Sequence, residues 1–210
     1  MASPLAVYAD MLERPHERSL ARAVDGSAWR PRVDRWTGRA DAVDERALAG
    51  LAGPVLDVGC GPGRHLCALG RRGVAALGID VSPAAVDLAR LAGARAIVRS
   101  IFEELPLAGR WESALLLDGN IGIGGSPDRL LRRVTELLAS GGRIVVELGP
   151  PTRATVRTRV RLETVRAASE WFDWAAVSAA DVDYVLADAG LVAVERWHES
   201  DRWFVIAARP

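Results

Sequence analysis

Short apolar runs alternate with amphipathic segments through the middle and end of the chain. Residues 114–117 (Ala-Leu-Leu-Leu) and 144–146 (Ile-Val-Val) are continuously apolar, which is typical of parallel strands that helices cover on both faces. Their alternation with helical segments predicts an α/β fold built on a mostly parallel sheet. The expected strands in this part of the chain are residues 55–58, 75–80, 95–99, 113–117 and 143–148.

Two predicted helices begin at Ser-Pro pairs. At Ser82-Pro83 the hydroxyl is suited to cap the first turn, and proline is favoured at the first helical position. Ser126-Pro127-Asp128 opens the second helix, and Gly141-Gly142 is expected to end it. The apolar stripe of this second helix consists of Leu130, Leu131, Val134, Leu137 and Leu138.

The end of the chain predicts one more helix and then a two-stranded hairpin. Ser178 and Asp181 form the pattern of a capping box, and Gly190 is placed to end that helix. Residues 191–198 and 202–208 are two runs joined by a short polar turn. Because the second run is largely apolar on both faces, we expect it inside the sheet.

A glycine-rich turn follows the first of the predicted strands. Residues 55–63 read Val-Leu-Asp-Val-Gly-Cys-Gly-Pro-Gly, so a ligand can lie directly against the backbone. The next strand ends in Asp80, a carboxylate placed to accept hydrogen bonds from a ribose diol. The spacing is G-x-G-x-G, with Asp57 two residues before the first glycine, whereas a nicotinamide dinucleotide site requires G-x-G-x-x-G. A strand-to-helix turn that holds no ligand is the structural alternative.

Residues 55–63 together with Asp80 resemble motif I and the acidic strand-end residue of the class I S-adenosylmethionine (SAM) methyltransferases. The resemblance covers about residues 51–149 and 178–210. It implies a three-layer, Rossmann-like α/β fold with seven strands in the order 3-2-1-4-5-7-6, of which strand 7 is antiparallel. It also implies SAM as the cofactor and S-adenosylhomocysteine (SAH) as its product.

The resemblance assigns cofactor contacts to the glycine turn and to the strand ends beside it. The glycines would line the methionyl moiety, Asp57 would help to hold its amino group, and Asp80 would bind the ribose hydroxyls. Val81 and Ser82 would lie beside the adenosine. The full set of expected contacts is Asp57, Gly59, Cys60, Gly61, Gly63, Asp80, Val81, Ser82, Ser100, Ile101, Phe102 and Asp118.

The adenine contact departs from the family pattern. Family members often place an acidic residue a few positions before a Leu-Pro pair, where it contacts the adenine amine. Here Leu105-Pro106 is present, but Ile101 occupies the acidic position. Ser100, Phe102 or Glu103 are the candidates to replace that carboxylate.

The fourth strand of the predicted sheet ends in residues 118–125, Asp-Gly-Asn-Ile-Gly-Ile-Gly-Gly. Four glycines after a charged strand end indicate close backbone approach to a ligand, or a mobile lip. In the resembled fold this place faces the methyl group and the acceptor, so Asp118 and Asn120 are predicted catalytic residues. The structural alternatives are a carboxylate that bonds turn amides and an asparagine in a left-handed turn.

His65, at the start of the helix after the glycine turn, is the third predicted catalytic residue. Its side chain titrates near neutral pH, so it is suited to orient a substrate or to act as a base. A histidine on the helix surface is the alternative. Arg64 is placed either to bind the SAM carboxylate or to face solvent, and Glu147 ends the fifth strand at the same edge. The three histidines are scattered, so nothing resembles a metal site.

Residues 1–50 and 150–177 lie outside the resemblance. We expect a single domain, residues 1–210, in which both segments cap the cofactor cleft and shape the acceptor pocket. Within 156–163, apolar positions alternate with mostly arginine positions, which predicts a half-buried strand with a basic outer face. The two segments hold four tryptophans, Trp29, Trp36, Trp171 and Trp174. Their alternative role is to attach the two segments to the core.

Composition gives no general electrostatic case for nucleic acid or an anionic membrane, since 27 cationic residues balance 27 acidic ones. No apolar run approaches a membrane span, and residues 1–14 lack a signal region. The two cysteines, Cys60 and Cys67, fit neither a redox pair nor a zinc site, so the cytoplasm is the expected compartment. A monomer or a homodimer is expected.

The expected function is SAM-dependent methyl transfer to an oxygen or nitrogen of a small organic molecule. SAM carries its own leaving group, so the protein mainly has to align the reacting atoms and exclude water. A SAM-binding protein without transfer activity, which would regulate or scaffold, is one alternative. A nicotinamide-dependent oxidoreductase is another, and the early third glycine argues against it.

Overall fold

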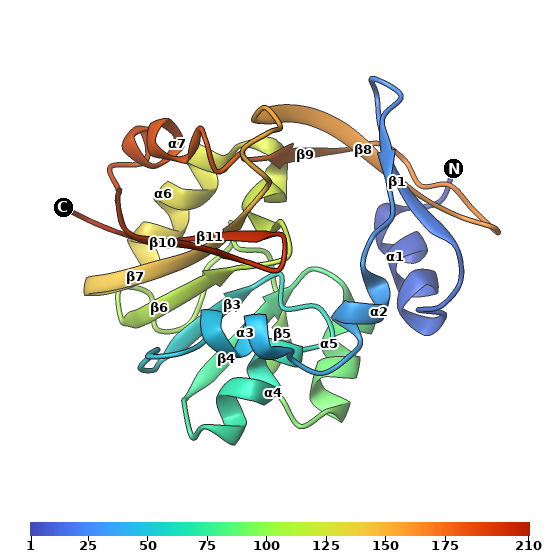
Figure 1. Ribbon diagram of the computed structural model, residues 1–210. Helices are drawn as coiled ribbons and strands as arrows, with labels where there is room; N and C mark the ends of the chain where they lie inside the picture. The colour runs from blue at the N-terminus through green and yellow to red at the C-terminus, as the bar shows by residue number, and fades with distance from the viewer.

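Two β-sheets organise the chain, which a computed structural model describes over residues 1–210 (Figure 1). The larger sheet has seven strands in the order β10-β11-β7-β6-β3-β4-β5, and the smaller has four in the order β2-β1-β8-β9. The strands of the larger sheet are β3 (Val55–Val58), β4 (Ala76–Asp80), β5 (Ala96–Val98), β6 (Trp111–Leu116), β7 (Leu138–Leu148), β10 (Val192–Glu199) and β11 (Arg202–Ala208).

The larger sheet has the predicted topology. Numbered along the chain, its seven strands run 3-2-1-4-5-7-6 across the sheet, and only the last, β11, is antiparallel to its neighbours. As expected from its apolar residues, β11 lies inside the sheet between β7 and β10. The predicted α/β fold class, strand order and closing hairpin are confirmed.

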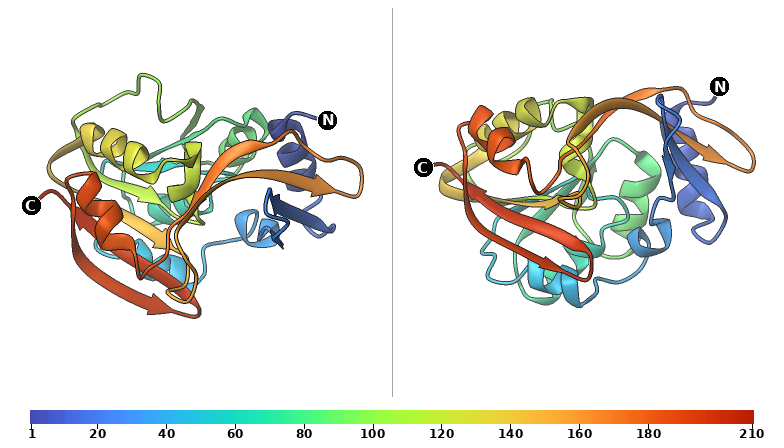
Figure 2. Two further views of the ribbon diagram at one scale, coloured as in Figure 1. Left: turned by 90° about the horizontal axis from the view of Figure 1, so that it is seen from above. Right: turned by 45° about the horizontal axis from the view of Figure 1, so that its top comes forward.

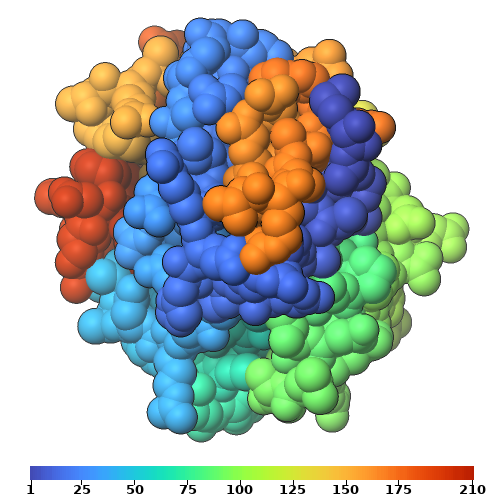
Figure 3. Space-filling model, turned by 90° about the vertical axis from the view of Figure 1, so that its right-hand side faces the viewer, coloured from blue at the N-terminus to red at the C-terminus, as the bar shows by residue number.

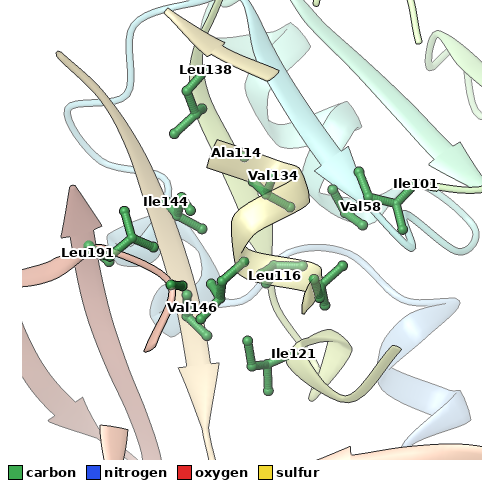
Figure 4. Close-up of a cluster of buried hydrophobic side chains, with 14 of the residues drawn as sticks. Val58, Ile101, Ala114, Leu116, Ile121, Val134, Leu138, Ile144, Val146 and Leu191 are labelled. Carbon is green, nitrogen blue, oxygen red and sulfur yellow. The ribbon is translucent and has the colours of Figure 1, made fainter. Parts of the chain in front are cut away.

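Helices cover both faces of the larger sheet and make the three layers visible in Figure 1. Helices α6 and α7 lie on one face, and α3, α4 and α5 lie on the other. The largest apolar cluster fills the space between the sheet and the α6–α7 layer (Figure 4). The helices are α1 (Pro4–Glu13), α2 (Val33–Trp36), α3 (Ala42–Ala47), α4 (Arg64–Arg71), α5 (Pro83–Leu91), α6 (Pro127–Leu137), α7 (Val182–Asp188) and the 3-10 segment η1 (Asn120–Gly125).

Helix α6 is shorter than its apolar pattern predicts. It ends at Leu137, and Leu138 is already extended, as the first residue of β7. Leu138 pairs with Trp111 of β6, so its buried side chain belongs to a strand and not to the stripe of the helix. The prediction that Gly141-Gly142 ends the helix is therefore wrong, because both glycines lie within β7.

The predicted capping box before α7 is also wrong. The helix begins at Val182, after Asp181, whose side chain makes no cap bond. Instead the Asp181 carboxylate accepts from the Thr155 amide at 3.0 Å, and the Ser178 hydroxyl accepts from the Ala180 amide at 3.1 Å. These polar side chains fasten the preceding segment and do not cap the helix. The predicted stop is confirmed, since Gly190 follows the helix in a left-handed conformation.

The two segments outside the resemblance combine into the smaller sheet, here called the cap sheet. Strands β1 (Ser19–Ala23) and β2 (Ala28–Trp29) come from the N-terminal segment, and β8 (Val156–Thr164) and β9 (Phe172–Ala176) come from the later one. Strands β1 and β8 pair antiparallel, and an Arg22–Glu163 ion pair with hydrogen bonds of 2.9 and 3.1 Å spans them. Figure 3 shows the N-terminal segment and residues of the later one side by side on one face of the molecule.

Candidate active site

A cavity of about 1280 Å³ lies between the larger sheet and the cap sheet. Its floor includes the carboxyl ends of β3, β4, β6 and β7, where ligands bind in open parallel sheets. Its roof is formed by the cap sheet, which arches over from the core in Figure 2. A typical small-molecule site measures about 300–1,000 Å³, so this cavity has room for more than one ligand.

The glycine turn forms part of the floor. Gly59, Cys60 and Gly61 line the cavity, and both glycines have positive φ values that side chains disfavour. A methyl group added at Gly61 would lie 3.3 Å from the Tyr8 hydroxyl, which shows how narrow the space above the turn is. Gly63 is different: it lies outside the cavity, and an added methyl would lie 2.9 Å from Cβ of Ala89. The third glycine therefore lets α4 pack on α5 and does not line the predicted methionyl site.

Asp80 is placed at the cavity wall by the end of β4. Its carboxylate accepts from the Gly61 amide at 3.0 Å and from the Ser82 amide at 2.8 Å, which fixes its orientation beside the turn. Burial raises the pKa of Asp80. Half-exposed Val81 lines the cavity next to it, whereas Ser82 is buried away from the cavity and caps α5 through the Ala85 amide at 3.3 Å. The cap at Ser82 is the one predicted from sequence.

The segment after β5 places Ser100 and Ile101 at the cavity and Phe102 outside its lining. The Phe102 ring lies under the Arg129 guanidinium at 4.6 Å. Glu103 accepts from the Ser100 amide at 2.7 Å, so its carboxylate closes a local turn. Of the residues proposed to replace the adenine-binding carboxylate, only Ser100 lines the cavity.

Asn120 links η1 to the glycine turn. Its side-chain amide donates to the carbonyl oxygens of Val58 and Gly59, both at 2.9 Å. The left-handed residues here are Asp118 and Gly119, and Asn120 opens the 3-10 segment, so the left-handed alternative for Asn120 is wrong. Asn120 lines the cavity while holding its floor together.

The glycines of η1 approach protein, not ligand. A methyl group added at Gly122 would lie 2.1 Å from the Ala175 carbonyl oxygen, and one at Gly125 would lie 2.9 Å from Cβ of Asp173. Strand β9 of the cap sheet can therefore pack on η1 only because these positions lack side chains. This contact fixes the cap sheet over the cavity.

Asp118 lines the cavity and is held by Arg64. The Arg64 guanidinium donates to both Asp118 oxygens, at 2.5 and 2.9 Å. Although burial opposes it, the Arg64 contact lowers the pKa of Asp118. The Asp118 amide donates to Oε2 of Glu147 at 2.9 Å, so its left-handed backbone is also anchored. The solvent-facing alternative for Arg64 is wrong, because its side chain is only 3% exposed. Arg64 is a buried ion-pair partner of a cavity carboxylate and itself lines the cavity.

A buried group of charges supports Arg64 from behind; we call it the Asp44 cluster. The Asp44 carboxylate, from α3, is fully buried and accepts from Arg64 at 2.9 Å, Arg35 at 3.0 Å and Arg202 at 2.9 Å. Arg202 in turn donates to both Glu147 oxygens at 2.7 Å. Sequence reasoning missed this cluster because its members lie far apart along the chain, and because Arg35 and Asp44 come from a segment that the family pattern does not cover.

His65 belongs to the same cluster and not to the cavity. Its Nε2 lies 3.5 Å from Asp44 and its Nδ1 lies 3.8 Å from Asp57, and the side chain is only 5% exposed. Burial alone lowers the pKa of His65, but the two carboxylates outweigh it and raise the pKa to about 9. The surface alternative is wrong, and the predicted role as substrate base has no geometric support. Asp57 is likewise buried and lies outside the cavity lining.

Tyr8 of α1 is a cavity residue that the sequence did not reveal. It lies above Gly61, and its ring meets Trp36 edge-on at 6.1 Å between centroids. Burial, followed by the nearby Asp80 carboxylate, raises the pKa of Tyr8. No spacing in residues 1–50 distinguishes this tyrosine from an ordinary helix residue, and only the fold brings it to the turn.

Three of the four cap tryptophans line the cavity. Trp29, Trp36 and Trp174 are part of its wall, whereas Trp171 stacks under Arg161 at 5.0 Å outside it. In all, the cavity brings together nine of the predicted site residues: Gly59, Cys60, Gly61, Asp80, Val81, Ser100, Ile101, Asp118 and Asn120. Five lie outside its lining: Asp57, Gly63, His65, Ser82 and Phe102.

The segment that carries the glycine turn matches a known family. Residues 56–146 match the family model described as a methyltransferase domain. This segment contains the glycine turn, Asp80 and the β6–η1 junction.

Solved structures share the whole fold, at sequence identities below 25%. A SAM-dependent methyltransferase from Bacteroides fragilis, in complex with S-adenosyl-L-homocysteine, has a TM-score of 0.81 at 24% identity and covers 99% of this chain and 94% of its own. The 1,6-didemethyltoxoflavin-N1-methyltransferase of Burkholderia thailandensis has a TM-score of 0.64 at 20% identity, with coverages of 99% and 90%. The CcbJ methyltransferase of Streptomyces caelestis has a TM-score of 0.63 at 18% identity, with coverages of 99% and 98%.

Proposed function

We propose that this chain is a class I SAM-dependent methyltransferase that methylates an oxygen or nitrogen of a small organic molecule. The observation that carries the proposal is the size of the cavity, about 1280 Å³, roofed by a cap sheet that both extra segments build. A cofactor alone does not need this space. The nicotinamide alternative is set aside by the family match.

The cavity floor fits the nucleoside and amino-acid parts of SAM. Gly59 and Gly61 present backbone without side chains to the cavity, and Asp80 presents a carboxylate fixed by two amides beside them. We assign Asp80 to the ribose hydroxyls and the glycine turn to the methionyl part. We assign Ser100 and Ile101 to the adenine side. When bound, SAM supplies an electrophilic methyl group and its own leaving group.

The remaining floor residues act by positioning. Asn120 ties η1 to the turn through the Val58 and Gly59 carbonyls, and Arg64 holds Asp118 at the cavity wall. The cap sheet excludes water from the space above them, which strengthens electrostatic interactions within it. Proximity and exclusion of water are what a transfer from a pre-activated donor requires.

The acceptor is proposed to be small because the cavity is closed over by β8 and β9 and lined by aromatic side chains. The balanced charge of the chain gives no support to a nucleic-acid acceptor. No helix of the structure is long and apolar enough to cross a membrane. The Burkholderia thailandensis enzyme is bound to 1,6-didemethyltoxoflavin and S-adenosylhomocysteine, which supports this proposal. We further propose that residues 1–210 act as one domain, with 1–50 and 150–177 forming the acceptor side.

The test combines binding with transfer. Calorimetry should show that SAH binds and that Asp80→Ala weakens it by at least about tenfold. Ser82→Val is the matched control. It removes the buried helix cap near Asp80, and so lowers stability, but it removes no group that lines the cavity. The protein, labelled SAM and a cell metabolite extract should then give a labelled small molecule. SAH binding without any labelled product would favour the non-catalytic SAM-binding alternative, and absence of SAH binding would reject the assignment altogether.

A further inference from the structure

The acceptor side of the cavity is apolar and aromatic. The inner face of the cap sheet and the adjoining N-terminal segment supply its wall, and aromatic rings bind flat apolar molecules by stacking and edge contacts. Burying an uncompensated charge against such a wall is costly. The wall residues that carry the argument are Ala23, Trp36, Val160, Leu162, Phe172 and Trp174.

The charged side chains of the cap sheet lie at the rim or are already engaged. Arg157 pairs with Asp128 at 2.5 Å and is 60% exposed, and Asp173 is 72% exposed. Asp25 accepts from the amide and hydroxyl of Ser27. Arg99 and Arg153, which also line the cavity, are exposed. The interior of the acceptor side therefore offers no buried, unpaired charge to a charged acceptor.

The two strand-end carboxylates at the floor are occupied by arginines. Both oxygens of Asp118 accept from Arg64, and both oxygens of Glu147 accept from Arg202. A carboxylate held in this bidentate way is a poor proton acceptor, because protonation breaks a charge-assisted pair. Burial raises the pKa of Glu147 to about 7, so Glu147 is the strongest rival base. Its Oε2 also accepts from the Asp118 amide at 2.9 Å, which leaves this oxygen poorly placed to receive a proton.

The other titratable groups are no better placed. Burial raises the pKa values of Cys60 and Tyr8, so both keep their protons at neutral pH. Asp80 is engaged by the Gly61 and Ser82 amides and is assigned to the cofactor. His65 lies outside the cavity lining. The acceptor must therefore arrive with its lone pair already free.

We propose, on the basis of the proposed function, that the acceptor is an uncharged, flat ring compound methylated on a ring nitrogen without a protein base. The nitrogen lone pair forms a bond to the methyl carbon as the carbon–sulfur bond breaks and its electron pair moves to sulfur. The sulfonium thereby becomes a neutral thioether, and the positive charge passes to the nitrogen. A proton on the product nitrogen, where there is one, leaves to water afterwards. The nearby Asp118 carboxylate favours this cation without taking a proton.

Three bicyclic probes of similar size test the proposal: isoquinoline, with a free nitrogen lone pair; 2-naphthol, which must lose a proton; and 2-naphthoate, which is charged. Binding to the SAH-loaded protein is followed by quenching of tryptophan fluorescence and by calorimetry. Transfer from labelled SAM is followed at neutral pH. Isoquinoline should bind and yield N-methylisoquinolinium. Naphthol should react at least about 100-fold more slowly, the usual effect of a missing base, and naphthoate should bind at least about tenfold more weakly than isoquinoline.

Matched tryptophan variants locate the binding. Trp174→Ala should weaken isoquinoline binding about tenfold and leave SAH affinity unchanged, whereas Trp171→Ala, outside the cavity, should change neither. Trp174→Phe keeps an aromatic face and should retain most of the affinity for isoquinoline. This result would show that Trp174→Ala weakens binding through loss of the ring and not through loss of packing on η1.

Two results would overturn the inference. One is naphthol transfer as fast as isoquinoline transfer, with loss of the naphthol reaction in Glu147→Gln marking that carboxylate as a base. The other is SAH binding with no binding of isoquinoline, or with preferential binding of naphthoate. Absence of SAH binding would instead count against the proposed function, so the two failures are distinguishable.

Discussion

The Asp44 carboxylate of α3 accepts a hydrogen bond from Nε of Arg64 at 2.9 Å, and the two side chains are 0% and 3% exposed. This pair joins the N-terminal segment to the helix that follows the glycine turn. Through Arg64 it also reaches Asp118 at the cavity wall. A residue outside the family pattern thus fixes a group that faces the ligand.

Removing the charge at Asp44 should destabilise the protein strongly. Asp44→Asn leaves Arg35, Arg64 and Arg202 without their shared counter-charge in a buried place, and breaking such a pair costs about 3–5 kcal/mol. Urea denaturation measures the loss. Asp183→Asn, which removes an exposed ion pair, should stay within about 0.5 kcal/mol of the wild type. Equal effects of the two variants would contradict the role of the Asp44 cluster.

His65 should make stability depend on pH. Its pKa is raised to about 9 in the folded protein, against about 6.5 unfolded. A pKa raised on folding stabilises the protonated form, so this contribution is fully present below the unfolded pKa and disappears as pH rises through 9. Its size is on the order of 3 kcal/mol. The free energy of unfolding of wild type minus His65→Gln should therefore fall between mildly acidic and alkaline pH. A constant difference would mean that the pKa of His65 does not change on folding.

Gly63 should prove structural and not cofactor-binding. Gly63→Ala forces a side chain into a left-handed residue 2.9 Å from Ala89 Cβ, which we expect to cost about 1–3 kcal/mol. Gly70→Ala, in the same helix with open space around it, should instead stabilise by about 0.5–1 kcal/mol. Thermal unfolding with and without SAH separates the effects. If Gly63→Ala instead lowered the SAH affinity at unchanged stability, Gly63 would belong to the methionyl site.

Tyr8 should contribute to cofactor affinity from outside the family pattern. Its ring covers the turn at Gly61, so Tyr8→Ala should weaken SAH binding about tenfold by opening the site to water. Tyr8→Phe keeps the ring and should lose less. Tyr184, which is 78% exposed, supplies the control variant Tyr184→Ala. Calorimetric affinities that match across all three variants would show that α1 leaves the cofactor site uncovered.

The core was predictable because its signals are local. A few neighbouring residues are enough to predict each of three features: the strand-to-helix turn at 55–63, the end of β4 at Asp80 and the apolar strand β11. The strand order then followed from the resemblance. The boundary between α6 and β7 was not predictable, because Leu138 is apolar in either structure and only its pairing with Trp111 decides.

The site was less predictable because its contacts join distant segments. The position of His65 in the sequence is the same whether its side chain faces a ligand or two buried carboxylates. Its contacts with Asp44 and Asp57 are made only in the folded structure. The glycines after β6 predict an approach to a ligand, but β9, about fifty positions later, fills the space beside Gly122 and Gly125.

Asp118→Asn should separate catalysis from cofactor binding. Asparagine tolerates the left-handed conformation of residue 118 (φ 56°) and keeps one oxygen for Arg64, so the backbone of the cavity wall should persist. The lost negative charge removes the stabilisation of a cation developing on the acceptor, which should lower turnover on the order of tenfold. SAH affinity, measured by calorimetry, should change by less than about threefold. Asp118→Ala, which neither bonds Arg64 nor favours this conformation, should in addition unfold at lower urea. If both variants instead lose SAH binding in parallel with turnover, Asp118 holds the cofactor and not the reacting methyl group.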